Sequence, residues 1–321
     1  MATVSVIMPA YNVAPYVAAA VESACAQTCR DLEVLVTDDG STDESADIVA
    51  AIAARDSRVK LIRKANGGIS TARNHALAIS TGRYLALLDS DDTWDPEHVE
   101  EQLTLLEARP EVSIVTGNAR FLGSRLDGRP ARPWPDPRPA PDLASILADE
   151  ESIFIMSIFR REVYERIGGF DESMRTNEDY DYWLRAAIAG FTFARNDRPL
   201  GCYRRRDDSL SATEERMLRG ILRVYRKTAP LLADRPHERR ILERQVDRFE
   251  VQLLRVEIGA AIAAGDVAGA AERLDALHAR RPDLSIGLAR VMAHWTPGLL
   301  ARAYRVRRQR RELRMAGPQL T

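Results

Sequence analysis

The sequence predicts an α/β fold with a parallel sheet, followed by an all-α C-terminal region. Two observations indicate the α/β part. Short β-rich segments alternate with helical segments of about ten residues, which is typical of βαβ units. Polar residues follow these strands directly, at the sheet edge where open α/β folds bind ligands. From about Thr213 the sequence is typical of helices throughout.

The expected elements follow one another with short connections. Strands are expected at residues 4–9, 32–37, 59–63 and 85–88, and helices at residues 15–27, 45–54 and 70–79, with a further helix after Asp95-Pro96. Pro9 is expected to end the first strand, because proline cannot donate a backbone hydrogen bond to a sheet. Farther along, residues 112–117 and 152–161 are strand-like, and the proline- and arginine-rich loop at residues 123–141 is expected to be irregular.

The apolar segment at residues 85–88 ends in Asp89, Asp91 and Asp92. Carboxylates this close repel one another, and their oxygens suit Mg²⁺ or Mn²⁺. A polar turn that caps the next helix is the alternative, and this segment alone does not decide between the two. Asn12, Asp39 and Asn66 also follow strands of the expected sheet. Four polar strand ends at one crevice favour a ligand site over isolated turns.

Composition excludes several classes of protein. The chain has 321 residues, 45% of them hydrophobic, and a formal net charge of -1, which gives no overall attraction for nucleic acid. Cys25, Cys29 and Cys202 are too few for a disulfide framework or a four-cysteine zinc site, so we expect reduced thiols in a cytoplasmic protein. Neither a signal peptide nor an apolar run of membrane-spanning length is evident.

Two common phosphate-binding motifs are absent from the sequence. It has no G-x-G-x-x-G after the first strand and no G-x-x-x-x-G-K-[ST], so the dinucleotide and P-loop interpretations lose their main support. A divalent ion at the carboxylates of residues 89–92 is the available way to hold a phosphate.

Four sequence blocks, taken together, resemble the successive blocks of family 2 glycosyltransferases. They are residues 4–12, 36–43, 66–74 and 88–92, and the resemblance extends over about residues 3–212. It implies the GT-A fold, a Rossmann-like mixed sheet flanked by helices. A nucleotide-sugar-binding half would cover residues 1–118 and an acceptor-binding half residues 119–212, followed by a helical region with a basic tail at residues 213–321.

The resemblance also implies roles in donor binding. Pro9, Tyr11 and Asn12 would line the nucleotide pocket, Asp39 would accept the N3–H of uracil or thymine, and Asn66, Gly67 and Arg73 would border the ribose and pyrophosphate. Asp89 and Asp91 match the family's D-x-D element. Asp91 would hold Mn²⁺ or Mg²⁺ on the diphosphate, and Asp89 would contact the ribose or sugar and share in the metal site. Without the resemblance, Arg73 reads as a surface charge and Asn66 as a turn residue.

Glu178 and Asp179 lie at the start of an expected amphipathic helix. Acids at a helix N-terminus are favourable in themselves, which is the simplest interpretation. The resemblance implies instead that they are the family's acidic pair, in which Asp179 is the general base and Glu178 its partner. Since no candidate protein nucleophile is evident, we expect transfer with inversion.

Arg206 stands where the family often has a histidine that can bind the metal. A guanidinium cannot ligate a cation, but it can clamp a phosphate with two hydrogen bonds. We therefore expect Arg204 or Arg206 to supplement the metal on the diphosphate, which puts strict metal dependence in doubt.

The C-terminal region suggests partners. A helix, a Gly-Asp turn and a second helix are expected at residues 260–271, and this hairpin would pack on the catalytic half or mediate a homodimer. Trp295, Leu299, Leu300 and Tyr304 precede an arginine-rich tail. The tail is either a solvated helix end or a peripheral contact with the anionic inner face of the cell membrane, in which case the acceptor would be lipid-linked.

These inferences together predict an inverting glycosyltransferase. It would move one sugar from a UDP- or dTDP-type donor to a hydroxyl of a glycan or lipid-linked glycan, in cell-surface polysaccharide or glycoconjugate synthesis. The family's Q-x-x-R-W block of processive synthases is absent. The alternatives are a non-catalytic nucleotide-sugar-binding protein, which would not need Asp179, and a sugar-phosphate nucleotidyltransferase, which would need a glycine-rich basic first loop that residues 9–12 do not provide.

Overall fold

The computed structural model describes residues 2–123, 125–206, 213–296 and 298–304. The chain forms two compact units. The first unit consists of Met1–Ala212 and Val224–Leu242, and the second, called the helical unit below, consists of Thr213–Arg223 and Glu243–Thr321. Residues from 213 onward therefore contribute to both units. Among the described residues, no helix combines the length and the apolar content that crossing a bilayer requires.

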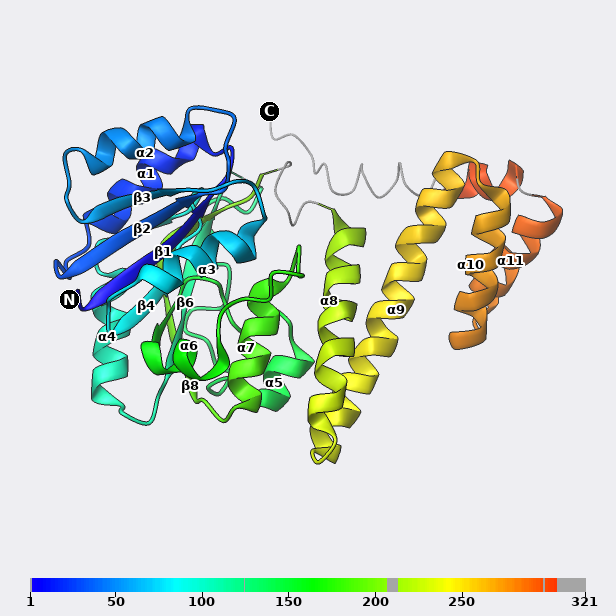
Figure 1. Ribbon diagram of the computed structural model, residues 1–321. Helices are drawn as coiled ribbons and strands as arrows, with labels where there is room; N and C mark the ends of the chain where they lie inside the picture. The colour runs from blue at the N-terminus through cyan, green and yellow to red at the C-terminus, as the bar shows by residue number, and fades with distance from the viewer. Residues whose placement is uncertain (1, 124, 207–212, 297, 305–321) are drawn as a thin grey trace. The chain divides into compact units, whose positions relative to one another are not determined.

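An eight-stranded sheet in the order β3-β2-β1-β4-β7-β6-β8-β5 organises the first unit (Figure 1). The expected parallel sheet is confirmed for β1 (Val4–Ala10), β2 (Leu32–Asp38), β3 (Val59–Arg63) and β4 (Tyr84–Leu87). Beyond β4 the sheet is mixed, as the resemblance implies. β7 (Ser157–Arg160) runs antiparallel to β4 and to β6 (Ile114–Leu122), β8 (Phe193–Arg204) is parallel to β6, and β5 (Thr93–Trp94) is antiparallel to β8.

Pro9 does not end the first strand, contrary to expectation, because β1 continues to Ala10. On the β4 side, the last ladder bond runs from the N–H of Leu88 to the carbonyl of Ile7. The carbonyl of Pro9 faces the same side and accepts a hydrogen bond from Ser90 Oγ at 2.7 Å. The ladder with β4 has already ended at this point, so the missing N–H of proline removes no strand pairing.

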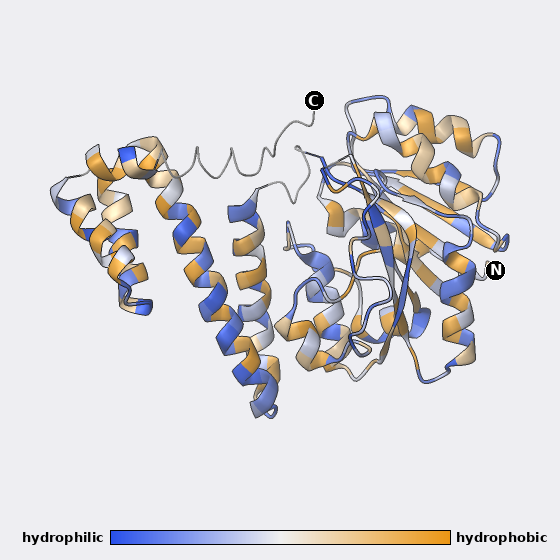
Figure 2. Cartoon of the chain, turned by 180° about the vertical axis from the view of Figure 1, so that it is seen from behind, coloured by the Kyte–Doolittle hydropathy of each residue, from blue (hydrophilic) through white to orange (hydrophobic). Residues whose placement is uncertain are grey.

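Helices cover both faces of the sheet (Figure 1). The helices of the first unit include α1 (Ala14–Cys25), α2 (Ser45–Ala53), α3 (Ile69–Ile79), α4 (His98–Ala108), α5 (Leu143–Ala148), α6 (Arg161–Ile167) and α7 (Glu178–Ile188). The C-terminal helices begin with α8 (Glu214–Thr228), which both units share. Val17, Val49 and Val99, from α1, α2 and α4, share one core cluster with β1 and β2, whereas α3 packs against the other face. All seven residues of β1 are buried, as expected for a strand covered on both faces. Figure 2 shows hydrophobic residues along these central strands.

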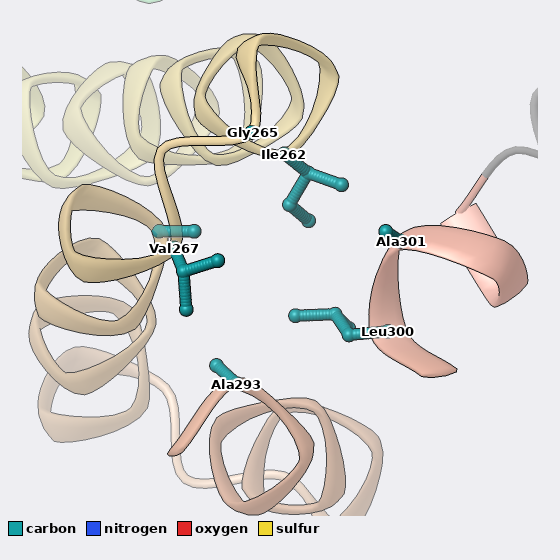
Figure 3. A pocket seen from close by; sticks show the side chains of 7 residues that line it. Ile262, Gly265, Val267, Ala293, Leu300 and Ala301 are labelled. Atoms are coloured by element: carbon teal, nitrogen blue, oxygen red, sulfur yellow. The ribbon is translucent and has the colours of Figure 1, made fainter. Parts of the chain in front are cut away.

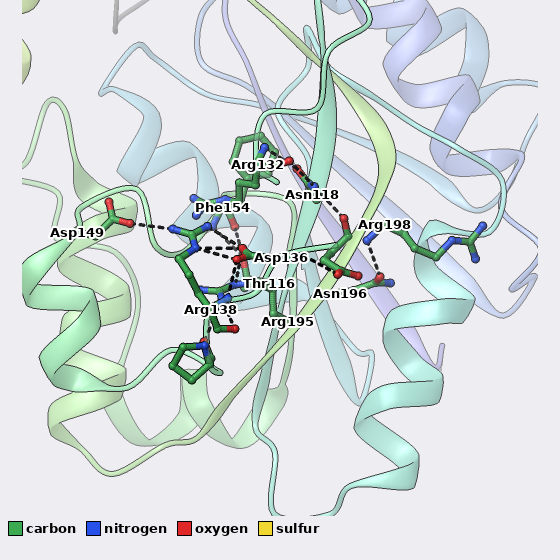
Figure 4. Close-up of polar contacts among 12 residues, drawn as sticks. Thr116, Asn118, Arg132, Asp136, Arg138, Asp149, Phe154, Arg195, Asn196 and Arg198 are labelled. Atoms are coloured by element: carbon green, nitrogen blue, oxygen red, sulfur yellow. Dashed lines mark hydrogen bonds and ion pairs between the residues drawn. The ribbon is translucent and has the colours of Figure 1, made fainter. Parts of the chain in front are cut away.

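The proline-rich loop contains no helix or strand in its described part, residues 123 and 125–141, and makes one isolated bridge from Pro130 to Arg120. Side chains hold it in place instead (Figure 4). Asn118 of β6 accepts a hydrogen bond from the Arg132 N–H at 3.1 Å and donates one to the Arg132 carbonyl at 3.3 Å. Asp136 accepts from Arg138 at 2.7 Å and lies 3.6 Å from Arg195 Nε. The loop is therefore irregular, as expected, and side-chain contacts fix its conformation.

Three helices form most of the helical unit. α9 (Pro236–Ala264) enters it from the first unit, and α10 (Val267–Arg280) and α11 (Leu284–Trp295) follow. The expected Gly-Asp turn is confirmed between α9 and α10. Gly265 adopts a φ of 76°, a conformation that favours glycine, and the Asp266 side chain caps α10 by accepting from the Gly269 N–H at 2.9 Å. The apolar core of this unit includes Val251, Ile258, Ala271, Leu274, Leu277 and Ala293.

Candidate functional site

The residues predicted to bind a donor gather where the parallel strands end. Tyr11 and Asn12 follow β1, Asp39 follows β2, and Asp89 lies two residues after β4. Because β1, β2 and β4 are parallel and adjacent, these positions share one edge of the sheet. The structure thus brings the predicted strand-end residues together, in the place where open α/β sheets bind ligands.

Asp39 is 3% exposed and is held by the turn after β3. Its carboxylate accepts hydrogen bonds from the Gly67 N–H at 2.9 Å and the Gly68 N–H at 2.7 Å, and it forms an ion pair with Lys64. Asn66 is exposed beside them. This arrangement fixes the orientation of the Asp39 carboxylate. A nucleobase that donates to Asp39 must therefore share an oxygen that already accepts a hydrogen bond. Sequence reasoning missed Lys64, whose only signal is its place directly after β3.

Asn12 links the end of β1 to the turn after β2, whereas the side chain of Tyr11 is exposed. Asn12 has a left-handed backbone with a φ of 50°, and its Oδ1 accepts from the Thr42 N–H at 2.8 Å. Its own N–H donates to Ser41 Oγ at 3.0 Å. Tyr11 is 48% exposed. Of the two neighbours, Tyr11 is the one free to contact a ligand through its side chain.

Arg73 links the two acidic motifs. Its guanidinium is 1% exposed and donates to Asp89 Oδ1 and to Glu178 Oε1, each at 2.6 Å. Phe170 packs against it, with the ring centroid 5.2 Å away. Burial disfavours the charged form, but Asp89 and Glu178 outweigh it and raise the pKa of Arg73 above its usual range. Arg73 is therefore a buried bridge between the D-x-D element and the pair at the start of α7, not a surface charge.

Asp179 lies at the first turn of α7 and is half-buried. Burial and the neighbouring Glu178 raise the pKa of its carboxyl to about 6, against the opposing effects of Arg73 and of the Tyr180 N–H, which donates to Asp179 Oδ1 at 2.8 Å. A carboxylate with a pKa near 6 can accept a proton under physiological conditions and pass it on to water, which suits a general base.

Two arginines, Arg204 at the end of β8 and Arg206 just after it, contact the D-x-D loop. Arg206 Nε lies 3.2 Å from Asp91 Oδ2, and the Arg204 N–H donates to Asp92 Oδ1 at 2.7 Å. Both guanidinium groups stack on the ring of Tyr16 in α1, at 4.6 Å for Arg204 and 5.3 Å for Arg206. The structure thus places both predicted arginines at the acidic loop. Sequence reasoning missed Tyr16, because a single tyrosine inside a helix carries no distinguishing pattern.

Burial and mutual repulsion disfavour the charged forms of the acids in this loop. Burial, followed by the charge of Asp89, raises the pKa of Asp91, and burial with both neighbouring acids raises the pKa of Asp92 well above its usual range. Asp92 Oδ2 is buried and has no hydrogen-bond partner among the described residues. These carboxylates fit a divalent cation.

The same residues do not form a closed metal cage. In the part of the chain that the structure describes, no group of three or more histidine, cysteine, aspartate or glutamate side chains has the arrangement to hold a metal ion. Mg²⁺ commonly binds through one or two carboxylates, with substrate phosphates and water completing its shell. Asp91 and Asp89 fit this mode, in which a diphosphate supplies the remaining ligands.

This sheet, with a D-x-D loop at its edge and an acidic pair across Arg73, defines a GT-A-type glycosyltransferase domain. The chain belongs to glycosyl transferase family 2, whose sequence pattern matches residues 5–168. The resemblance seen in the sequence is thereby confirmed, as is the predicted fold.

Relatives extend the comparison. The chain is 30% identical over 226 residues to TuaG of Bacillus subtilis (strain 168), provisionally named a teichuronic acid biosynthesis glycosyltransferase, covering 70% of this chain and 87% of TuaG. It is 32% identical over 190 residues to the chondroitin synthase of Pasteurella multocida (strain Pm70), covering 58% of this chain and 19% of that enzyme. The match thus spans only a fifth of that much longer protein.

Solved structures share the fold. TarS of S. aureus (residues 1–349) in complex with UDP-GlcNAc superposes with a TM-score of 0.68 at 20% identity, covering 95% of this chain and 88% of that one. The mannosyltransferase PcManGT of Pyrobaculum calidifontis, in complex with GDP-Man and Mn²⁺, gives a TM-score of 0.61 at 20% identity, covering 94% of this chain and 86% of that one.

Proposed function

We propose that the chain transfers one sugar from a UDP- or dTDP-type donor to a hydroxyl of a glycan acceptor, with inversion at the anomeric carbon. One observation carries the proposal. Arg73 contacts Asp89 and Glu178 at 2.6 Å each, so the donor-side acids and the acidic pair lie on either side of a single guanidinium. This arrangement suits a direct displacement, in which the proton leaves the acceptor on one side of the anomeric carbon while the diphosphate departs on the other.

Asp179 is the proposed base, with Glu178 as its partner. The raised pKa of Asp179, about 6, suits proton removal from an acceptor hydroxyl near neutral pH. A positioned base of this kind contributes roughly 10²- to 10⁴-fold to the rate. Glu178 raises the pKa of Asp179 through its charge, while its contact with Arg73 sets its own position.

The donor is proposed to lie over the strand ends. Tyr11 would contact the nucleobase, and Pro9 and Asn12 would line the pocket around it. Asp39 would accept a hydrogen bond from the N3–H of the nucleobase. Asn66 and Gly67 would border the ribose. Asp91 and Asp89 would hold Mn²⁺ or Mg²⁺, which supplies charge neutralisation at the departing diphosphate. Arg204 and Arg206 would add a second source of positive charge. The UDP-GlcNAc complex of TarS and the Mn²⁺ complex of PcManGT, which share this fold, support a nucleotide-sugar donor and a divalent metal.

The acceptor is proposed to be a polysaccharide or glycoconjugate that carries an anionic group. The names of TuaG and of chondroitin synthase support a polysaccharide. Arg132 is 8% exposed, packs over the ring of Phe154, and has a buried Nε without a hydrogen-bond partner among the described residues (Figure 4). The charges of Asp149 and Glu151 act on it but do not offset its burial. Burial, followed by the nearby Arg138, lowers its pKa to about 10. A carboxylate or phosphate on the acceptor would neutralise this charge.

The cytoplasmic location, the peripheral contact with the inner face of the membrane and the homodimer belong to the proposal as well. The arginine-rich tail at residues 305–321, from which the membrane contact was inferred, lies outside the described residues.

The decisive experiment compares the purified chain with Asp179→Asn. We expect the wild type to release UDP or dTDP from a nucleotide sugar in the presence of Mn²⁺ and acceptor glycans, and the variant to lose at least about 100-fold in kcat. Thermal shifts with UDP should be equal for both, because donor binding does not need the base. Asp47→Asn, which alters an exposed aspartate on α2, is the matched control and should retain full activity.

Three results would contradict the proposal. A nucleotide-sugar sensor would show the thermal shift with no turnover in the wild type. A nucleotidyltransferase would release pyrophosphate from a nucleoside triphosphate and a sugar phosphate. Full activity of Asp179→Asn would exclude Asp179 as the base.

A further inference from the structure

Helix α11 presents apolar side chains on the side that faces solvent. Leu284 is 94% exposed, Leu288 62%, Val291 53% and Trp295 82%. Their spacing of three or four residues places them on one side of the helix. Leu299, which follows in the chain, is 56% exposed. We call Leu284, Leu288, Val291 and Trp295 the outer face of α11.

The opposite side of the same helix is already packed. Ala293 is 1% exposed in the core of the helical unit, and Ile286 and Ala289 pack against that core. A helix at the surface of a globular protein normally has one apolar side and one polar side, and a helix that is apolar on both is normally covered on both. The outer face of α11 therefore fits a helix with a second partner.

Two of the residues that the sequence suggested for a membrane contact, Leu300 and Tyr304, pack inside the helical unit. Leu300 lines an apolar hollow with Ile262, Val267 and Ala293 (Figure 3). Tyr304 lies against Gly259 of α9. Trp295 and Leu299 remain available, and Leu284, Leu288 and Val291 are the members that sequence reasoning missed. The hollow offers no polar side chain, so it does not suit a sugar.

Charge distinguishes between possible partners for the outer face. From residue 284 to residue 304 the chain contains no aspartate or glutamate. Over residues 284–321 the sequence contains eight arginines and one acidic side chain, Glu312. A second copy seated on this face would bring two strongly basic segments together, and like charges at an interface are unfavourable. An anionic surface gains from the same charges.

We propose that the outer face of α11 inserts at the surface of an anionic phospholipid bilayer. Its apolar side chains enter the boundary between headgroups and acyl chains, and the basic composition of the C-terminal sequence favours an anionic over a neutral lipid surface. This inference specifies the membrane contact of the proposed function, but it does not depend on the transfer reaction.

The proposal is tested by co-sedimentation of the full chain with vesicles. The two compositions are phosphatidylcholine alone and an equal mixture of phosphatidylcholine and phosphatidylglycerol. We expect binding to the mixed vesicles, little binding to the neutral ones, and weaker binding as salt rises. Leu288→Ser and Trp295→Ser should each weaken the partition about tenfold, because each removes a large apolar side chain from the lipid. Leu231→Ser, at a 51% exposed leucine of the first unit, is the matched control.

Fluorescence provides an independent measurement. Trp94 and Trp183 are buried, so Trp134→Phe leaves Trp295 as the exposed tryptophan among the four. We expect its emission to shift to the blue on binding mixed vesicles.

Several outcomes would overturn the proposal. They are equal binding of the wild type and the Leu288→Ser and Trp295→Ser variants, equal binding to neutral vesicles, and a concentration-dependent dimer that both substitutions dissociate. UDP release measured without vesicles should be unchanged by both substitutions, so failure of vesicle binding and failure of the transfer reaction are told apart.

Discussion

Replacement of Arg73 by methionine should have a large effect on both folding and catalysis. The guanidinium is 1% exposed and joins Asp89, whose side chain is 25% exposed, to Glu178, whose side chain is 8% exposed. Methionine fills a similar volume but leaves the buried Glu178 carboxylate without its cation. Removal of one partner from a buried ion pair costs about 3–5 kcal/mol. Since Asp89 can regain water, we expect a decrease in the free energy of unfolding near the lower end of that range, about 3 kcal/mol.

Denaturant unfolding of the two proteins at pH 7.5 measures this difference, provided that the m-values agree. Glu178→Gln and the double variant complete a cycle. The double variant should be more stable than the sum of the single effects predicts, because the loss of Arg73 costs less when Glu178 carries no charge. Lys227→Met, which affects ion pairs with Asp171 and Asp181 elsewhere in the first unit, tests whether any lost pair has the same effect.

The same substitution has a catalytic signature that a purely structural role would lack. Arg73 lowers the pKa of Asp179, so its removal should move the acidic limb of the kcat/KM profile to higher pH. A decrease in stability below about 1 kcal/mol, together with an unshifted pH profile, would refute the inference that Arg73 couples the two acidic motifs.

Three further predictions concern the reaction itself. In the wild type, kcat/KM should rise with pH through about 6, because Asp179 must be deprotonated to act as a base and its pKa in the folded protein is about 6. A flat profile between pH 5 and pH 8 would contradict this. Arg206→Ala should weaken UDP binding about tenfold in the presence of EDTA and less with Mn²⁺, because a charge-assisted contact to phosphate is lost. Titration calorimetry measures both affinities. An unchanged affinity without metal would show that Arg206 does not contact the diphosphate. Arg132→Gln should raise the KM for an anionic acceptor about tenfold and leave the KM for the donor unchanged, with Arg132→Lys in between; equal effects on both substrates would indicate a general structural role.

The N-terminal strands could be predicted because their signal is local. Apolar segments of strand length, each followed by polar residues, appear in the sequence as they appear in β1, β2 and β4. The polar residues that follow them were therefore placed at the correct edge. Pro9 was misjudged because its effect depends on the neighbouring strand, which stops pairing before proline is reached.

Contacts over long sequence separations could not be predicted. Arg73 and Glu178 lie 105 residues apart, and nothing in either segment indicates that one guanidinium serves both. Lys64 and Tyr16 reach the site only because the sheet and α1 bring them there. The mixed character of the sheet was implied only by the family resemblance, and the order of β7, β6 and β8 was not predicted at all.

The sequence by itself determined the alternation of strands and helices, the family, and the acids and arginines available at the strand ends, because these depend on neighbouring residues and on recognisable blocks. Only the tertiary structure decided which charges neutralise one another and which apolar side chains stay uncovered. Burial is a property of the packed chain, so a buried Arg73 and an exposed Trp295 emerge only once distant segments have come together.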